Sequence, residues 1–186
     1  MNAFETERLV VRHLRPDDLD DFAALTGDPE TMRSMDDGLP LSREQTRNWI
    51  AVSEANYRTR GYGCFAVTSK PDGRMIGFCG FAFPPDRPGI VEVIYAFAPS
   101  CWSRGYATEA VRASLAFGFE QCGLTRIEAT VYPSNHASKR VLEKVGMVYG
   151  GRGQDDDGSF TDYFAIEREA SPRAETLAST VIAAAS

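Results

Sequence analysis

A stretch near the middle of the chain constrains the fold more than any other. Residues 90–98 are apolar, aromatic or β-branched apart from Glu92, a composition typical of a strand buried on both faces. Pro99 ends this strand because proline has no N–H for the ladder. From Arg104 onward, apolar residues recur at helical spacing, with Ala107 and Val111 one turn apart. The stretch therefore predicts a central strand, a short turn and a helix.

The predicted turn suits a phosphate group. A helix N-terminus presents unpaired backbone N–H groups and the positive end of the helix dipole. Gly105 lets a ligand approach the backbone closely, and Arg104 adds a fixed positive charge. Glycine is also common in ordinary strand-to-helix turns, and neither G-x-G-x-x-G nor G-x-x-x-x-G-K-[ST] occurs here. The turn alone therefore leaves a phosphate site and a plain connection as two alternatives.

Length and charge narrow the class of protein. A chain of 186 residues with 43% hydrophobic and 25% charged residues is typical of one globular domain, which we place at 1–170. Residues 171–186 form an Ala/Ser/Thr-rich tail, expected to be a weak helix or disordered. The net charge of −6 and the absence of a basic stripe argue against nucleic-acid binding.

Location and metal content follow from composition as well. No apolar run approaches the roughly 20 residues of a membrane span, and the N-terminus lacks the basic-then-apolar order of a signal peptide. Four cysteines are scattered without a C-x-x-C pair, and the only imidazoles are His13 and His136. We therefore expect a cytoplasmic protein with reduced thiols and no metal site.

Alternation and turn residues give the order of elements. Strands are predicted at 7–14, 62–69, 74–83, 90–98, 125–132, 148–152 and 159–166. Helices are predicted at 15–26, 28–32, 42–60, 104–122 and 135–144, the third of them opening with a capping box of Ser42 and Gln45. This order predicts an α/β (α+β) fold with a sheet of mixed direction.

Four segments carry a resemblance to a known family. They are Thr6–Leu9 with Leu14–Asp18, Asp28–Met32 followed by Ser42–Trp49, Trp102–Ala110, and Asn135–Met147. From Thr6 to about Ile166 the chain resembles a GNAT-fold N-acyltransferase of the branch that includes the ribosomal-protein N-terminal acetyltransferases. The most specific segment is the last, where an asparagine precedes a serine by three residues and Leu-Glu-Lys-x-Gly follows.

The resemblance implies the fold and the donor. It implies a mixed, mostly antiparallel sheet of about seven strands flanked by helices, acetyl-CoA as acyl donor, and no metal. The loop and the first helical turn after it would bind the pyrophosphate through Arg104, Gly105, Tyr106, Ala107 and Thr108. The backbones of Phe97 and Ala98 at the strand end would bind the pantetheine amides.

The sequence departs from the superfamily at two positions. Trp102 stands where the loop pattern begins with glutamine or arginine, which is usual for this branch. Many members carry a tyrosine four residues after the position of Ser138, where it protonates the leaving thiolate. Here that position is Leu142, so the tyrosine role cannot be transferred.

Asn135 and Ser138 each have a structural and a functional interpretation. Asn135 can cap its helix, while the resemblance implies contact with pantetheine or acceptor. Ser138 lies on the edge of the buried helix face, where it can bond back to the carbonyl near Ser134. The resemblance favours a hydroxyl near the CoA sulfur that donates to the leaving thiolate.

Glu92 is the only charged residue of the central strand. A buried carboxylate needs a partner, so one interpretation is a salt bridge with an arginine from a neighbouring strand. The other is a general base for the acceptor ammonium, directly or through water, a role that the superfamily often gives to this position. Glu109 is expected to interact with the helix dipole rather than to take part in catalysis.

Two further groups of residues each have two interpretations. Four aromatic residues are either core or walls of an acceptor pocket: Trp49, Tyr57, Tyr62 and Tyr95. Four acids form either a solvated loop or an acidic rim that favours cationic amines: Asp28, Glu30, Asp36 and Asp37.

We therefore predict an enzyme that moves an acetyl group from acetyl-CoA directly to a primary amine. The acceptor is a protein or peptide N-terminus, or alternatively a small amine such as a polyamine, amino acid or antibiotic. The missing tyrosine keeps a third hypothesis, a non-catalytic acyl-CoA-binding module. A monomer and a homodimer are both compatible with the sequence.

Overall fold

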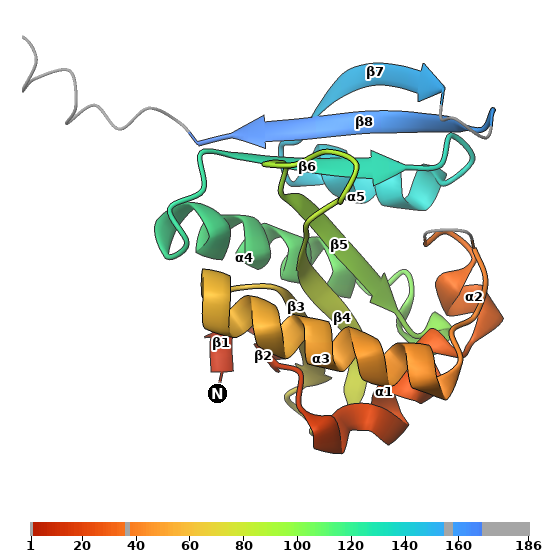
Figure 1. Cartoon of the computed structure of the whole chain (residues 1–186), viewed down its shortest axis with the longest axis vertical. Helices are drawn as coiled ribbons and strands as arrows, with labels where there is room; N and C mark the ends of the chain where they lie inside the picture. Colours follow the sequence, from red (N-terminus) through yellow and green to blue (C-terminus); the bar gives the residue numbers. More distant parts are fainter. Residues whose placement is uncertain (1, 36–37, 155–157, 169–186) are drawn as a thin grey trace, which may run out of the picture.

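Eight strands form a single sheet in the part of the chain that the computed structural model describes, residues 2–35, 38–154 and 158–168 (Figure 1). The strands are β1 (Asn2–Glu5), β2 (Leu9–His13), β3 (Cys64–Ser69), β4 (Met75–Ala82), β5 (Glu92–Phe97), β6 (Arg126–Val131), β7 (Val148–Gln154) and β8 (Phe160–Glu167). Their order is β1-β2-β3-β4-β5-β6-β8-β7. The predicted tail, 171–186, lies outside the described residues, and the single-domain extent of 1–170 stays a prediction.

The predicted mixed, mostly antiparallel sheet is confirmed, since β5–β6 is the one parallel pair among the described strands. The expected number of about seven strands was one too low. The additional strand, β1, has four residues and pairs with β2 from Glu5 opposite Val10 to Asn2 opposite Arg12. A strand this short shows little alternation, so its pairing partner rather than its own pattern defines it.

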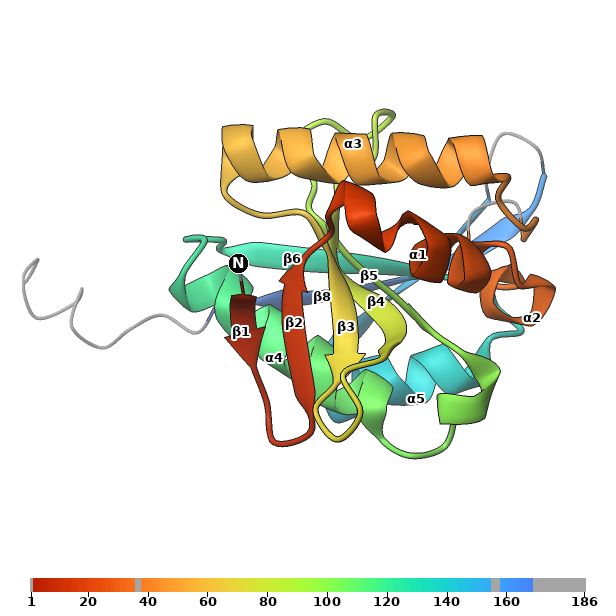
Figure 2. The same ribbon diagram turned by 90° about the horizontal axis from the view of Figure 1, so that it is seen from below.

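Helices cover both faces of the sheet. They are η1 (Pro16–Asp18), α1 (Leu19–Thr26), α2 (Pro29–Met32), α3 (Arg43–Arg60), η2 (Pro99–Cys101), α4 (Tyr106–Glu120) and α5 (His136–Lys144). Figure 2 shows α1 and α3 on one face and α4 and α5 on the other. The predicted capping box opens α3, with Ser42 and Gln45 bonded to each other's backbone N–H, and Gly61 ends it at φ 84°.

The side chains of β5 alternate between two hydrophobic cores, one on each face of the sheet. Ile94 and Ala96 pack with the α1–α3 core, which contains Phe22, Ile50 and Phe78. Val93, Tyr95 and Phe97 pack with the larger core around α4 and α5. The close approach of β4 to β5 requires Gly77, because a Cβ there would lie 2.4 Å from the Ala96 carbonyl oxygen.

The strands β5 and β6 separate along their length. Their described residues pair at one position, Glu92 opposite Glu128, and the Glu128 N–H donates to the Val91 carbonyl over 2.9 Å. Beyond this point β5 turns away from β6 (Figure 1). A sheet that opens in its middle exposes backbone groups of both strands between the two helical layers, and this opening positions the site.

Candidate active site

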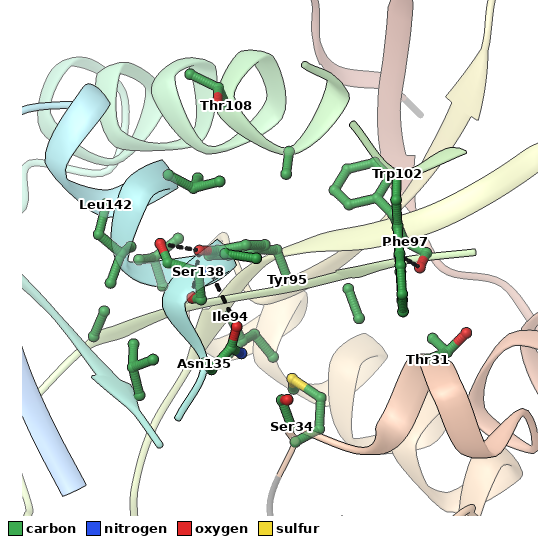
Figure 3. Close-up of a pocket in the computed structure, with 18 of the residues that line it drawn as sticks. Thr31, Ser34, Ile94, Tyr95, Phe97, Trp102, Thr108, Asn135, Ser138 and Leu142 are labelled. Carbon is green, nitrogen blue, oxygen red and sulfur yellow. Dashed lines mark hydrogen bonds between the residues drawn. The ribbon is translucent and has the colours of Figure 1, made fainter. Parts of the chain in front are cut away.

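A cavity of about 750 Å³ occupies the opening between β5 and β6 (Figure 3). Its lining includes most of the residues predicted for the site: Glu92, Phe97, Gly105, Tyr106, Ala107, Thr108, Asn135 and Ser138. Ala98 and Arg104, also predicted, are not among the lining residues. Segments separated by dozens of residues in the sequence therefore meet around one space.

The loop before α4 has the backbone geometry of an anion site. Gly105 caps the helix at φ 80°, a left-handed conformation that glycine adopts without strain. Ser103, which also lines the cavity, has φ 59°, an uncommon value for a residue with a side chain. The first turn of α4 also lines the cavity, and its N–H groups have no acceptor within the helix. Two left-handed residues before a helix N-terminus form a concave set of donors.

Arg8 holds this loop in place from a distant segment. Its Nη1 donates to the Arg104 carbonyl over 2.9 Å, and its guanidinium lies 4.4 Å from the centre of the Tyr106 ring. Glu109, in the first turn of α4, accepts from the Arg8 side chain at 2.6 Å and from the Arg8 backbone N–H at 2.9 Å. Burial raises the pKa of Glu109, but hydrogen bonds from Thr6 and Arg8 outweigh it, and the net pKa is lowered. Glu109 is thus a structural anion that holds Arg8.

The end of β5 offers the Phe97 backbone to the cavity. The Ala98 N–H donates to the Ile76 carbonyl over 2.9 Å, and the Ala98 carbonyl accepts from the Cys101 N–H over 2.8 Å. Because backbone groups alternate sides along an antiparallel strand, the N–H and C=O of Phe97 point away from β4, toward the opening. The Trp102 indole N–H donates to that carbonyl over 2.7 Å. Ala98 is thus bonded within the fold, and the Phe97 N–H faces the cavity.

The structure confirms that Asn135 caps α5, since its Oδ1 accepts from the Ser138 N–H over 3.0 Å. This cap fixes the first turn of the helix and with it the position of Ser138. The Ser138 hydroxyl lies 2.7 Å from the Tyr95 hydroxyl (Figure 3). The Ser138 hydroxyl is thus hydrogen-bonded to a side chain of β5 and not to the carbonyl of the preceding turn.

The sequence leaves open whether Tyr95 belongs to the core or to a pocket wall. Strand alternation places it with Val93 and Phe97 on the α4–α5 side, and it lines the cavity. Burial raises the pKa of Tyr95, and the hydrogen bond with Ser138 acts in the opposite direction. Leu142, at the family's tyrosine position, is fully buried. The phenol that contacts Ser138 therefore comes from β5 and not from α5.

Glu92 is buried, with 7% exposure, and it is ion-paired. Its Oε1 accepts from the Arg87 guanidinium, and the Thr130 hydroxyl donates to its Oε2 over 3.3 Å. Arg87 lies in the loop before β5 and also contacts Glu128 at 3.2 Å, so the arginine does not come from a neighbouring strand as expected. The salt-bridge interpretation therefore describes the observed structure, and Glu92 still faces the cavity.

The opposite side of the cavity is formed by α2, the residues after it, and α3. Lining residues there include Glu30, Arg33, Ser34, Met35 and Trp49. Trp49 both packs on Phe22, with ring centroids 5.5 Å apart, and reaches the cavity. The charges of Glu30 and Arg33 are opposite, so this described rim is mixed rather than acidic.

Contacts decide the roles of three other residues that the sequence leaves open. Asp28 caps α2 by accepting from the Thr31 N–H over 2.7 Å, and this hydrogen bond lowers its pKa. Tyr57 stacks on Phe65 and Tyr62 packs on Phe81, so both are core residues. Asp36 and Asp37 lie outside the described residues.

Among the described residues, no group of three or more histidine, cysteine, aspartate or glutamate side chains could hold a metal ion. None of the helices in the described ranges has both the length and the apolar composition that crossing a membrane requires.

Comparison with known proteins agrees with this geometry. A family model described as an acetyltransferase (GNAT) domain matches residues 8–148. The uncharacterized protein YkkB of Bacillus subtilis (strain 168) is 36% identical over 129 residues, which cover 69% of this chain and 74% of YkkB.

Solved structures show the same fold. The crystal structure of a GNAT-family acetyltransferase from Bacillus anthracis has a TM-score of 0.74 and 28% identity, covering 89% of this chain and 98% of that one. The ribosomal L7/L12 α-N-protein acetyltransferase RimL, solved with coenzyme A, has a TM-score of 0.78 at 16% identity, covering 92% of this chain and 100% of RimL. At that identity the similarity to RimL concerns the fold.

Proposed function

Because this chain belongs to the GNAT acetyltransferase family, we propose that it transfers an acetyl group from acetyl-CoA directly to a primary amine, such as a protein or peptide N-terminus. The observation that supports this most strongly is the meeting of three features in one cavity. They are the N–H groups of the α4 N-terminus, the Phe97 N–H and the Ser138 hydroxyl. A donor with a pyrophosphate, amides and a thioester needs these groups in this order.

The proposed donor fits the loop residues. The pyrophosphate would bind at Gly105 and the first turn of α4, where a Cβ on residue 105 would only touch Arg8, at 3.4 Å. The pantetheine would lie along β5 as an added strand and use the Phe97 backbone. Arg140 and Lys144 on α5 also line the cavity and add positive charge for the phosphates.

The chemistry proposed is a direct displacement. The neutral amine attacks the thioester carbon, the N–C bond forms, and the C–S bond breaks with its electron pair moving to sulfur. The Phe97 N–H would polarise the thioester oxygen, and the Ser138 hydroxyl would donate a hydrogen bond to the thiolate. The amine's proton leaves through water. Holding amine and thioester together supplies much of the rate.

Glu92 is the proposed general base. It lies where β5 and β6 begin to separate, on the wall shared with Ile94 and Ala96. Its carboxylate, held by the salt bridge with Arg87, would attract an acceptor ammonium. We propose that the proton of the amine passes to Glu92 through water and on to solvent.

The proposed acceptor is a peptide N-terminus. The similarity in fold to RimL, whose name states a protein N-terminal acceptor, favours a peptide N-terminus. The mixed charges of Glu30 and Arg33 beside Trp49 suit an acceptor with both polar and apolar parts, such as the first residues of a peptide. A small-molecule amine is the alternative, since the same fold serves both classes.

The test is thiol release from acetyl-CoA by the purified chain with a panel of N-terminal peptides, polyamines, amino acids and aminoglycosides. Mass spectrometry of each acceptor identifies the acetylated nitrogen, and reactions without an amine give the hydrolysis background. Acetylation of at least one amine class well above that background is expected. Tight CoA binding with no acetylated acceptor would instead support the non-catalytic acyl-CoA-binding module.

A further inference from the structure

Two hydroxyl groups from different elements of the cavity lining share one hydrogen bond. Tyr95 on β5 and Ser138 on α5 place their oxygens 2.7 Å apart, and the Tyr95 oxygen also lies 3.4 Å from the Ser138 carbonyl oxygen (Figure 3). The two residues are 43 positions apart in the sequence. The contact therefore exists because the fold brings β5 and the first turn of α5 together.

A serine hydroxyl has a single proton, so the direction of this hydrogen bond decides what Ser138 can do. If Ser138 donates to Tyr95, its proton is occupied and its oxygen can only accept. If Tyr95 donates to Ser138, the Ser138 proton is free to point at another acceptor in the cavity. Only the second arrangement provides a donor for a sulfur that gains negative charge.

The surroundings favour the second arrangement. Burial raises the pKa of Tyr95, so the phenol keeps its proton and acts as a donor. It has two acceptors within reach, and the Ser138 hydroxyl oxygen at 2.7 Å is at a much better hydrogen-bonding distance than the carbonyl oxygen at 3.4 Å. A chain of two hydroxyl groups that ends on an anion also polarises cooperatively.

We propose that Tyr95 is a positioning residue that donates to Ser138 and turns the Ser138 proton toward the sulfur of the acyl donor. This inference rests on the proposed function, because it assumes that a thioester lies beside Ser138. During transfer the electron pair of the C–S bond moves to sulfur, and the Ser138 hydroxyl stabilises the thiolate. Neither hydroxyl loses its proton, and the free thiolate is protonated by water after release.

The arrangement also accounts for Leu142. That residue packs at 0% exposure and offers no hydrogen bond to the cavity, whereas the phenol enters from β5. The charged residues that line the cavity are Glu30, Arg33, Glu92, Arg140 and Lys144. They stay the same in every variant below, so differences among the variants report on the two hydroxyl groups.

The first experiment compares Tyr95→Phe with Ser138→Ala and with the double variant. Tyr95→Phe keeps the ring and removes the oxygen, so kcat is expected to fall about tenfold, the effect of one hydrogen bond, while KM for acetyl-CoA changes by less than about threefold. Ser138→Ala is expected to lower kcat by at least as much. In the Ser138→Ala background, Tyr95→Phe should cause no further loss, because Tyr95 acts only through Ser138.

Tyr62→Phe is the matched control, since Tyr62 packs on Phe81 and Phe83 away from the cavity lining. Its kcat should equal that of the unmodified chain. Unchanged kcat in Tyr95→Phe, or the same loss from Tyr95→Phe with and without Ser138, would overturn the proposal.

A second measurement can be made without an acceptor amine. The pKa of the CoA thiol in the binary complex can be followed by thiolate absorbance, with the complex of desulfo-CoA subtracted to remove the protein's own groups. A hydroxyl donor stabilises the thiolate, so the bound thiol should have a lower pKa in the unmodified chain than in either Tyr95→Phe or Ser138→Ala, with the two variants alike.

This readout separates the two proposals. If no amine is acetylated but the thiol pKa differs as expected, the proposed function fails and the role of Tyr95 stands. If amines are acetylated but Tyr95→Phe leaves both kcat and the bound thiol pKa unchanged, the function stands and the role of Tyr95 is overturned.

Discussion

The Arg8 guanidinium lies 2.6 Å from the Glu109 carboxylate, which joins the residue before β2 to the first turn of α4. Arg8 in turn donates to the Arg104 carbonyl and stacks over Tyr106, so one cation contacts both the loop before α4 and the first turn of that helix. Fixed loop geometry matters because donors aimed at a phosphate bind best when they need no rearrangement.

Glu109→Gln tests this bracing. The variant removes the charge that holds Arg8 and should raise KM for acetyl-CoA about tenfold, as expected for the loss of a charge-assisted hydrogen bond, with kcat nearly unchanged. Steady-state kinetics and direct titration with CoA measure both effects. Glu120→Gln, at the other end of α4 and exposed, is the control. A fall in kcat without weaker CoA binding would instead give Glu109 a role in the chemistry.

Gly105→Ala tests the anion site itself. The left-handed conformation at φ 80° costs a residue with a Cβ about 1–2 kcal/mol, so the loop should relax and bind CoA roughly tenfold more weakly. Gly73→Ala creates similar strain at φ 68° in the β3–β4 hairpin, with no atom within 4 Å of the new Cβ. Equal CoA affinity in the two variants, measured by calorimetry, would contradict a phosphate site at residue 105.

Glu92→Gln tests the proposed base. Without a base the reaction depends on amine that is already neutral, so kcat/KM should fall about a hundredfold at pH 7 and the loss should shrink as pH rises toward the amine pKa. Glu128→Gln is the control because Glu128 also contacts Arg87 but does not line the cavity. A parallel loss at every pH, as from a purely structural salt bridge, would rule out Glu92 as base.

Asp162→Asn tests how α5 is anchored. Asp162 accepts from Arg152 at 2.7 Å and is ion-paired with Lys139, the residue after Ser138. The hydrogen bond from Arg152, with a further contribution from Lys139, holds the pKa of Asp162 well below its usual range. We expect the variant to lose about 2 kcal/mol of unfolding free energy at pH 7. Glu167→Gln, at an exposed ion pair with Arg126, should change stability little.

The pH dependence of this loss has a definite sign. A carboxyl whose folded-state pKa is depressed contributes stability that is complete above its unfolded-state pKa of about 3.9 and is lost as pH falls through the folded-state value. The difference between the unmodified chain and Asp162→Asn should therefore be constant above about pH 5 and shrink below about pH 4. Urea denaturation across this range measures it, and a difference that persists at low pH would contradict the assignment.

Local patterns predicted much of the fold. The capping box of Ser42 and Gln45 and the Asn135 cap are each specified by a few adjacent residues, and each is present. Such elements are predictable because their hydrogen bonds close within three or four positions. The strand β1 is not predictable in this way, because four residues are too few to show alternation.

The sequence by itself determined most of the elements and the family, and it indicated which segments line the cavity. Tertiary structure decided which side chains meet: Tyr95 with Ser138, Glu92 with Arg87, and Arg8 with Glu109. Adjacent residues constrain backbone geometry directly, whereas a contact between side chains on different elements depends on strand register, helix placement and the separation of β5 from β6. The strand-turn-helix at 90–110 was therefore recognisable from its own residues, but the hydroxyl pair beside it became visible only in the folded chain.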